Sequence, residues 1–349
     1  MTPYPSLYRA RSNEINMDEG ELMRDDIFGV LYDTGACSVG TAPALPVPAG
    51  EADGLDDWLE RGYNAGMEYM HNWRAVRLDP RLLLEGARTV ISMAFPYQAS
   101  RGIVASYALG DDYHEVLRGV LSEAVSTLKK CYGGEYRICV DSAPILERYW
   151  AEKCGVGLRG RNGLISVPGV GSRVFLAEIV TTLELPEAKS EISDMSHISD
   201  MSGVMSRSRK GFCPEGCRRC LEACPADALQ DNGRVDARRC LSYLTIEHRG
   251  DWDSVGKRVM KTPAGRNTLF GCELCLRACP MNSVPAQSRE DKVLSRLCPR
   301  PEIKALRGED VLVMTQPEFS RIFRGSPIKR AKLAGLQRNA RNMSGGEEE

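Results

Sequence analysis

Apolar residues gather in three runs in the first half of the chain, and each run has the composition of a β-strand. Residues 89–95 are almost entirely apolar and are followed by Pro96, which is typical of a buried strand that ends at a proline. A short strand is expected over residues 137–140, and a longer β-rich segment over residues 173–185. These runs predict the strands of a mixed α/β domain.

Between the first two runs, apolar residues recur at helical rather than strand spacing. They are Tyr113, Val116, Leu117, Val120, Leu121 and Leu128. Asp111 or Asp112 would cap the start of this segment, and Gly133-Gly134 would end it. The sequence therefore predicts an amphipathic helix over residues 112–131.

The composition changes near residue 186, and this change predicts the domain organisation. Two copies of Ile-Ser-Asp-Met-Ser, at 192–196 and 198–202, lie in a polar stretch without an apolar face. We interpret this stretch as a flexible linker or insertion rather than as a metal site built on His197. The predicted domains are an α/β domain over 1–185, the linker over 186–211, a cysteine-rich module over 212–290 and a helical, basic segment over 291–349.

Charge and hydropathy narrow the class of protein. The chain has 46 basic and 47 acidic side chains, and its net charge of −1 excludes a globally basic nucleic-acid binder but not a local basic patch. No apolar run approaches the roughly 18 residues of a membrane-spanning helix. The acidic stretch at 17–21 is unlike the basic start of a secretory signal. We expect a soluble, cytoplasmic protein.

Cysteine usage gives the strongest chemical signal. The chain has 13 cysteines, an odd number, and eight of them lie between Cys213 and Cys279. In a reducing compartment such crowding indicates metal ligation rather than disulfides. The two blocks are Cys213-x3-Cys217-x2-Cys220-x3-Cys224-Pro225 and Cys272-x2-Cys275-x3-Cys279-Pro280. Each ends in Cys-Pro, as the runs of bacterial two-cluster ferredoxins do.

In such ferredoxins the last cysteine of each run binds the cluster of the other run. This rule assigns Cys213, Cys217, Cys220 and Cys279 to one [4Fe-4S] cluster, called cluster one here. It assigns Cys224, Cys272 and Cys275 to cluster two, and Cys240 becomes the fourth ligand because it is the remaining cysteine of the module. The alternative is a pair of structural zinc sites, which use similar turns. The other cysteines are expected to be buried small side chains: Cys37, Cys131, Cys139, Cys154 and Cys298.

An electron carrier needs far fewer residues than this chain has, so the α/β domain is expected to hold the group that receives the electrons. Gly155, Gly157 and Gly160 match the spacing of a dinucleotide fingerprint, but they lie in no clear strand–turn–helix context. A flavin, a corrinoid or a haem-type group is therefore the expected acceptor.

Five longer blocks resemble the epoxyqueuosine reductase family. They are Ser106–His114, Val140–Arg148 with the nearby Ala151-Glu152-Lys153 and Gly155-Val156-Gly157, Val235–Glu247, Gly271–Asn282 and Gly325–Arg330. The likeness runs from about Gly66 to Met343, with the linker as an insertion. It departs from the family at Cys213-x3-Cys217, where Cys-x2-Cys is usual; Gly216 would let the extra residue bulge.

The resemblance implies an oxidoreductase that reduces epoxyqueuosine to queuosine at the wobble position of tRNA anticodons. It implies two [4Fe-4S] clusters and a cobalamin, with electrons passing through the clusters to the cobalamin. The implied α+β fold has a flavin-reductase-like cobalamin-binding domain, a two-[4Fe-4S] ferredoxin-like module and a short helical C-terminal arm. The expected partners are the tRNA and a low-potential electron donor of the ferredoxin or flavodoxin type, and a monomer is expected.

By the same resemblance, Asp141 is the proton donor to the alkoxide that forms as the epoxide opens. Burial beside a corrinoid and the apolar Val140 and Ile145 would raise the pKa of the Asp141 carboxyl and keep it protonated. The alternative is that Asp141 caps the turn into Pro144. With Asp141, the residues expected around the cobalamin are Tyr107, Asp112, Tyr113, Ser142, Arg161, Asn162, Gly163, Ser242 and Thr245. Most of these have an ordinary structural alternative. Asp112 could cap a helix and Tyr113 could pack in the core. Residues 161–163 could form an exposed loop, and Ser242 and Thr245 could bond the backbone of their own helix.

A basic stripe lies near the C-terminus. Between residues 321 and 341 there is no acid, and the basic residues are Arg321, Arg324, Lys329, Arg330, Lys332, Arg338 and Arg341. Such a stripe on a neutral protein is consistent with contacts to tRNA phosphates, although charge runs are often solvated helix faces. The expected tRNA contacts are Lys329, Arg330, Lys332 and Arg338.

Two other functions remain open from the sequence. A corrinoid enzyme of the reductive-dehalogenase type would also pair a cobalamin domain with a ferredoxin module. The absence of a twin-arginine leader and the presence of the basic stripe argue against it. The third hypothesis is a non-catalytic iron–sulfur electron carrier, which would bind no corrinoid.

Overall fold

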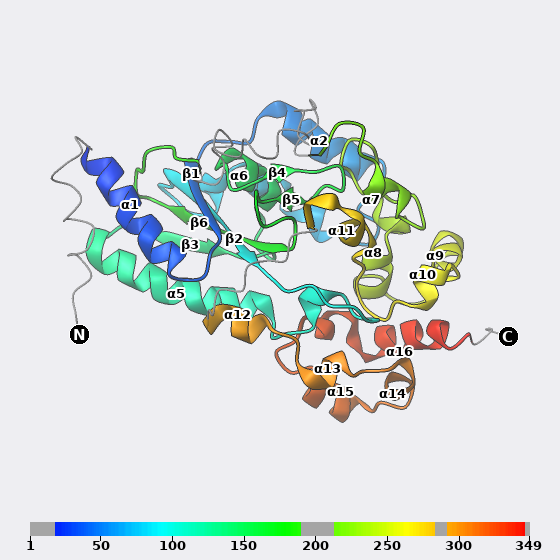
Figure 1. The fold of residues 1–349 in the computed structure, drawn as a ribbon. Helices are drawn as coiled ribbons and strands as arrows, with labels where there is room; N and C mark the ends of the chain where they lie inside the picture. The colour runs from blue at the N-terminus through cyan, green and yellow to red at the C-terminus, as the bar shows by residue number, and fades with distance from the viewer. Residues whose placement is uncertain (1–17, 190–212, 283–291, 346–349) are drawn as a thin grey trace.

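A four-stranded antiparallel sheet forms the centre of the first half of the chain (Figure 1). The computed structural model describes residues 18–189, 213–282 and 292–345. In spatial order the strands are β1 (Ser38–Pro43), β2 (Thr89–Pro96), β6 (Val174–Thr181) and β3 (Tyr136–Cys139). The three predicted strands are confirmed. Strand β1 was missed because its small residues, Ser-Val-Gly-Thr-Ala-Pro, form no large apolar run.

Strand β2 is buried along its full length, and helices cover both of its faces. Ile91 and Met93 pack in a core with residues of α1 (Glu19–Tyr32) and α5 (Tyr113–Tyr132). Val90 and Ala94 point the other way, into a core with α6 (Glu147–Lys153). A strand covered on both sides reads as a continuous apolar run, which is why this segment was readable from the sequence.

Helix α5 confirms the predicted amphipathic helix to within one residue at each end. Of the two candidate caps, Asp112 is the one used, because its carboxylate accepts the backbone N–H of His114 at 3.0 Å. The helix ends at Gly133, whose φ of 68° lies in the left-handed region that favours glycine. The start of α5 lies beside the segment that follows β3, because His114 contacts Asp141 there.

Short elements lie between the strands of the sheet along the chain. They are α2 (Ala49–Glu60), α3 (Tyr69–Asn72), α4 (Arg74–Leu78), the 3-10 turns Pro80–Leu82 and Ser106–Ala108, and the small hairpin β4 (Leu158–Arg159) and β5 (Ile165–Ser166). The glycines at 155–160 therefore lead from a helix into this hairpin. They do not form the strand–turn–helix of a dinucleotide site.

The cysteine-rich module is built from short helices beside the sheet (Figure 1). They are α7 (Arg219–Glu222), the 3-10 turn Ala237–Arg239, α8 (Leu241–Ile246), α9 (Ser254–Met260), α10 (Pro263–Arg266), α11 (Leu274–Ala278) and the 3-10 turn Pro280–Asn282. Ligand-bearing loops of this kind need little regular structure of their own, because the ligands and their clusters supply the cross-links.

The C-terminal segment is helical, as predicted. Its elements are α12 (Lys292–Leu297), α13 (Pro301–Lys304), α14 (Gly308–Leu312), α15 (Gln316–Ile322), the 3-10 turn η8 (Pro327–Ala331) and α16 (Lys332–Met343). The segment is not a free arm, because Phe319 and Phe323 share a buried core with Val104, Leu109 and Phe270. It thereby fastens the sheet domain to the cysteine-rich module.

The predicted linker lies mostly outside the described residues, at 190–211. Its first residues stay on the sheet, because Ala188 pairs with Thr41 of β1. The boundaries at 211/212 and 290/291 also fall outside the described residues, so the domain limits stay a prediction. Among the residues that the structure describes, no helix has the length and apolar character needed to cross a bilayer.

The prediction for the isolated cysteines is partly wrong. Cys139 and Cys154 are buried, and Cys37 and Cys298 are partly buried. Cys131 is exposed, because it lies on the solvent-facing side of the last turn of α5.

Candidate functional site

The eight cysteines of the module gather in two groups. Cys213, Cys217, Cys220 and Cys279 line one pocket, so the last cysteine of the second block joins the first three of the first block. In the other group, burial, together with the nearby Cys240 and Cys224, raises the pKa of Cys272 to about 12. Burial likewise raises the pKa of Cys275, followed by the effects of Cys272 and Cys240. The grouping matches the crossing rule, while the role of each cysteine as a ligand stays a prediction.

The spacing of these thiols bears on the choice between zinc and iron–sulfur. Within residues 18–189, 213–282 and 292–345, no three His, Cys, Asp or Glu side chains converge closely enough to hold a single metal ion. A structural zinc needs four ligands at about 2.0–2.3 Å from one ion. A cubane is wider and holds its thiolates farther apart than a single zinc ion does, so the two kinds of site require different spacings of the thiols. The extra residue of the first block forms an open bulge at Gly216, with a φ of 69° and nothing near its Cα hydrogen.

Asp141 lies directly after β3, facing the start of α5. Its carboxylate is 2.8 Å from Nε2 of His114, and Nδ1 of the same ring is 2.6 Å from the carboxylate of Asp112. The His114 ring stacks on Tyr113 at 4.0 Å, and Tyr113 stacks in turn on Phe175 at 4.2 Å. The helix cap and the stacked rings thus fix the imidazole between two carboxylates.

Proton affinities in this group differ from the sequence-based expectation. Desolvation pushes the pKa of Asp141 upward, but the hydrogen bond and charge of His114, with Tyr113 and Arg148, outweigh it and leave the pKa below its usual value. Desolvation lowers the pKa of His114, but its bonds to Asp112 and Asp141 prevail and raise it to about 9. For the chain by itself the shift is therefore opposite to the expected one, because His114 lies beside the carboxylate, and the effect of a corrinoid on Asp141 stays a prediction. At neutral pH the proton of this pair is on His114.

The capping alternative for Asp141 is also not borne out. Its carboxylate bonds His114 rather than a backbone N–H of the turn toward Pro144. The turn makes its own backbone bonds instead, from Ser142 N–H to the Val140 carbonyl and from Ile145 N–H to the Ala143 carbonyl.

Glu147 and Arg148, at the start of α6, complete the surroundings of Asp141. The Glu147 carboxylate accepts the backbone N–H of Asp141. Desolvation and the nearby charge of Asp141 raise the pKa of Glu147, so it keeps its proton more readily than an ordinary glutamate. Arg148 is exposed to solvent, yet desolvation is the largest influence on its pKa, which it lowers. We call Asp141, His114, Glu147, Arg148 and the side chains around them the Asp141 recess.

Several distant segments line the Asp141 recess. The charge of Asp141 acts on Tyr69 of α3, on Tyr107 and on Arg330 of η8. Arg330 pairs with Glu247 at 2.7 Å and lies over the Tyr69 ring at 5.9 Å. Cys275 of cluster two is among the charges that act on Arg148.

Sequence reasoning gave no role to His114, Glu147, Arg148 or Tyr69. The first three lie within blocks that carry the family resemblance, but only the folded chain brings them to Asp141. One local signal was present for His114. It lies two residues after a capping aspartate, where its ring can return to the cap carboxylate.

The predicted cobalamin contacts divide into two places. Ser142 stays beside Asp141, exposed and bonded by Arg118. Tyr107 packs edge-on against Tyr113, with ring centroids 6.2 Å apart. Asp112 is the α5 cap and His114 partner already described. Ser242, in α8, is partly buried, and its expected contact stays a prediction.

The remaining predicted contacts lie elsewhere. Arg161 and Asn162 line the pocket of cluster one, and the Arg161 backbone N–H is 3.3 Å from Sγ of Cys213. Gly163 packs against the backbone of Gly233. Thr245 is 1% exposed, and its hydroxyl donates to the Leu241 carbonyl at 2.7 Å. For Thr245 the alternative of a helix-backbone bond is confirmed.

The basic stripe is not uniform. Lys329 and Lys332 are exposed, and Arg330 is exposed but paired with Glu247. Arg338 is only 7% exposed; it lies 4.4 Å from the centre of the Trp252 ring and donates to the Gly250 carbonyl at 2.6 Å. The prediction that Arg338 contacts tRNA is therefore wrong, because this guanidinium is buried and donates its hydrogen bonds within the protein.

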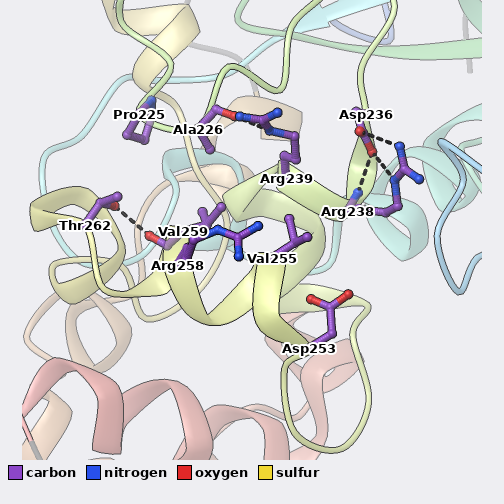
Figure 2. A pocket seen from close by; sticks show the side chains of 10 residues that line it. All are labelled: Pro225, Ala226, Asp236, Arg238, Arg239, Asp253, Val255, Arg258, Val259 and Thr262. Atoms are coloured by element: carbon purple, nitrogen blue, oxygen red, sulfur yellow. Dashed lines mark hydrogen bonds and ion pairs between the residues drawn. The ribbon is translucent and has the colours of Figure 1, made fainter.

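A second charged recess lies on the outer side of the loops that carry Cys224 and Cys240. We call it the arginine hollow, and its lining is shown in Figure 2: Pro225, Ala226, Asp236, Arg238, Arg239, Asp253, Val255, Arg258, Val259 and Thr262. Arg238 is held by both oxygens of Asp236 at 2.8 Å, and Arg239 donates to the Ala226 carbonyl at 2.6 Å. The guanidinium of Arg258 forms no hydrogen bond or ion pair with the residues that the structure describes.

Comparison with known proteins gives consistent results along the chain. A family model described as "Epoxyqueuosine reductase QueG, DUF1730" matches residues 77–142, and one described as a 4Fe-4S double cluster binding domain matches residues 213–282. The epoxyqueuosine reductase of Cyclobacterium marinum is 36% identical over 298 residues, which cover 83% of this chain and 86% of that protein.

Solved structures agree with this result. A crystal structure of epoxyqueuosine reductase with a tRNA-Tyr epoxyqueuosine-modified stem loop matches with a TM-score of 0.79 at 25% identity, over 93% of this chain and 81% of that one. A structure of the Bacillus subtilis epoxyqueuosine reductase, in which the catalytic aspartate loop is swung out of the active site, matches with a TM-score of 0.77 at 25% identity, over 93% and 82%. Neither the dehalogenase nor the electron-carrier hypothesis has comparable support. The chain belongs to the epoxyqueuosine reductase family.

Proposed function

We propose that this chain reduces epoxyqueuosine to queuosine at the wobble position of tRNA, and that Asp141 passes a proton to the epoxide oxygen. The overall reaction takes two electrons and two protons, removes the oxygen as water and leaves a carbon–carbon double bond. The observation that carries the proposal is the placing of Asp141, whose carboxylate contacts His114 and whose backbone N–H donates to Glu147.

Two [4Fe-4S] clusters and a cobalamin are the cofactors of this reaction. A bound cobalamin supplies a strongly reducing cobalt centre able to attack an epoxide carbon. The Asp141 recess suits such a group by the chemistry of its lining. Tyr69 offers a partly exposed ring to a flat macrocycle, and Arg148 and Ser142 offer donors to amide side chains. The flavin-reductase-like sheet domain would then be the cobalamin-binding domain.

The chain's own residues handle the proton. Asp112 holds the His114 ring at Nδ1, so Nε2 carries its proton toward Asp141. An ionised Asp141 cannot protonate an alkoxide by itself, but it can receive the His114 proton across 2.8 Å and donate it from its own carboxyl. His114, with its pKa of about 9, is protonated at neutral pH and serves as the store.

The electrons and the RNA reach the recess from different partners. A low-potential donor of the ferredoxin or flavodoxin type supplies two single electrons, which the cluster-binding cysteines relay. The exposed Lys329 and Lys332 of the C-terminal segment are suited to phosphates of the tRNA. The reaction would take place in the cytoplasm, where the tRNA is, with the protein acting as a monomer.

Reconstitution tests this proposal. The protein is loaded with iron, sulfide and cobalamin without oxygen, and is given a strong chemical reductant and tRNA from cells blocked at this step. Mass spectrometry of the nucleosides should show epoxyqueuosine replaced by queuosine. A fully loaded protein that leaves epoxyqueuosine intact would reject the proposal.

A further inference from the structure

The turn that carries Asp141 has a backbone conformation that an aspartate rarely adopts. Its φ is +54°, in the left-handed region that side chains other than glycine disfavour. This conformation accompanies the contact between the Asp141 carboxylate and His114. Such a conformation persists where surrounding groups hold it in place.

Glu147 supplies a contact of this kind from outside the turn. Its carboxylate accepts the backbone N–H of Asp141. Glu147 is the first residue of α6, and the next turn of that helix buries Trp150 and Ala151 in the core beside β2. The acceptor is therefore fixed to the sheet domain, whereas the bonds between backbone groups within the turn are local and would move with it. Arg118 of α5 also bonds the turn, at the Val140 carbonyl and the Ser142 hydroxyl, but it does not contact the Asp141 backbone N–H.

We infer that Glu147 is a positioning residue, whose carboxyl oxygen holds the Asp141 turn so that the Asp141 carboxylate meets His114. The inference rests on the proposed function, in which Asp141 handles the proton. In this inference Glu147 holds the Asp141 turn in place, whereas the cofactors supply the electrons and His114 supplies the proton. A loop of this kind has a second position in the Bacillus subtilis relative, where the catalytic aspartate loop is swung out of the active site.

The chemistry of Glu147 suggests a sharp set of variants. Desolvation and the charge of Asp141 favour the protonated carboxyl, so an uncharged oxygen is sufficient as the acceptor. Glu147→Gln keeps such an oxygen, whereas Glu147→Leu keeps bulk and removes the acceptor. Glu152→Leu is a matched control on the same helix, because Glu152 bonds Arg159 rather than the Asp141 turn.

The pKa of His114 reports directly on the position of Asp141. The chain has four histidines, so carbon-13-labelled imidazoles of the oxidised holoenzyme can be followed by NMR across a pH titration, with His114→Gln as the assignment standard. The His114 pKa should be about 9 in the wild type, and in Glu147→Leu it should fall toward its unperturbed 6.5 as Asp141 departs. It should stay high in Glu147→Gln and in Glu152→Leu. A His114 pKa that is unchanged in Glu147→Leu would overturn the inference.

Turnover provides a second, separate readout. With saturating tRNA, Glu147→Leu should lower kcat about tenfold with little change in KM, which corresponds to the loss of one well-placed hydrogen bond. Glu147→Gln should recover most of this loss. Equal losses in the Leu and Gln variants would contradict the inference. Glu147→Ala removes the same acceptor if the Leu variant does not fold. Because the titration needs no turnover, a wild type that fails to reduce epoxyqueuosine would reject the proposed function while the holding role is still judged on His114.

Discussion

The Asp141 recess and the arginine hollow are both lined by charged side chains, but their charges are compensated in different ways. In the recess, ionisable groups act on one another, so the pKa of His114 rises to about 9 and that of Asp141 falls. In the hollow, Arg238 is paired with Asp236, and Arg258 faces solvent. Displaced proton affinities accompany reactive sites. The comparison therefore teaches that coupling which displaces the pKa of a histidine and of a carboxylate together, rather than the number of charges, distinguishes the Asp141 recess.

The two regions also differ in how the chain builds them. The hollow uses one continuous stretch, from Pro225 to Thr262. The recess combines the turn that carries Asp141 with Tyr69, His114, Glu147 and Arg330, which come from four different elements. A site assembled from distant segments requires the whole fold, so its geometry is sensitive to single contacts in a way that the hollow is not.

Asp141→Asn should have the largest effect. Asparagine keeps the shape but cannot take up and donate the proton, so single-turnover queuosine formation should fall by roughly 10²–10⁴-fold. Absorbance spectra and metal analysis should show both clusters and the cobalamin retained. Undiminished turnover would return Asp141 to a structural role and break the contrast between the two recesses.

The pH profile should show the role of His114. A group with a raised pKa of about 9 is protonated below that pH and loses its proton above it, so the rate should be steady near neutrality and fall as the pH passes about 9. His114→Gln should lower the neutral rate by roughly 10–100-fold and remove this alkaline limb. The measurement is single-turnover product formation against pH. If the rate of His114→Gln still fell above about pH 9, the fall would have to come from the titration of another group.

The basic stripe should split into two classes of effect. Lys329→Glu should weaken tRNA binding severalfold at low salt and flatten its salt dependence, because one phosphate contact is lost. Arg338→Leu should leave the salt slope unchanged and instead lower the free energy of unfolding by roughly 2–4 kcal/mol, because buried carbonyls lose their donor. Filter binding over a salt series and denaturant unfolding separate the two. Equal salt slopes for Lys329→Glu and wild type would remove Lys329 from the RNA contact.

Arg258→Ala should have the smallest effect. This guanidinium has no partner among the described residues and lies on the surface, so turnover should stay within about twofold and stability within about 0.5 kcal/mol of wild type. Turnover and denaturant unfolding are the measurements. A tenfold loss of turnover would show that the hollow takes part in function.

The structure shows which parts of this account the sequence could supply. The grouping of Cys279 with Cys213 follows from spacing, because short Cys-x2-Cys turns and Cys-Pro ends limit where each thiol can point. Strand β2 was readable from its continuous apolar run, and helix α5 from the helical spacing of its apolar residues. Strand β1 was not, because small residues give no apolar signal.

The ionisation of Asp141 could not be read from the sequence for a different reason. Its apolar neighbours in the chain suggested a raised pKa, but the cation that decides the sign comes from His114, 27 residues earlier. Arg338 is the reverse case. In the sequence Arg338 belongs to the basic stripe. Only its contact with Trp252 in the folded chain shows that its side chain is buried. Tertiary contacts override local composition wherever charges are brought inside.

Complementation in cells tests the central claim most directly. In a bacterium deleted for its own epoxyqueuosine reductase, the ratio of queuosine to epoxyqueuosine in total tRNA is measured by mass spectrometry after expression of this chain or of Asp141→Asn at equal level. The account predicts that the wild-type chain restores queuosine and that the variant leaves epoxyqueuosine in place. Accumulated epoxyqueuosine with the wild-type chain, or equal queuosine with both, would contradict it.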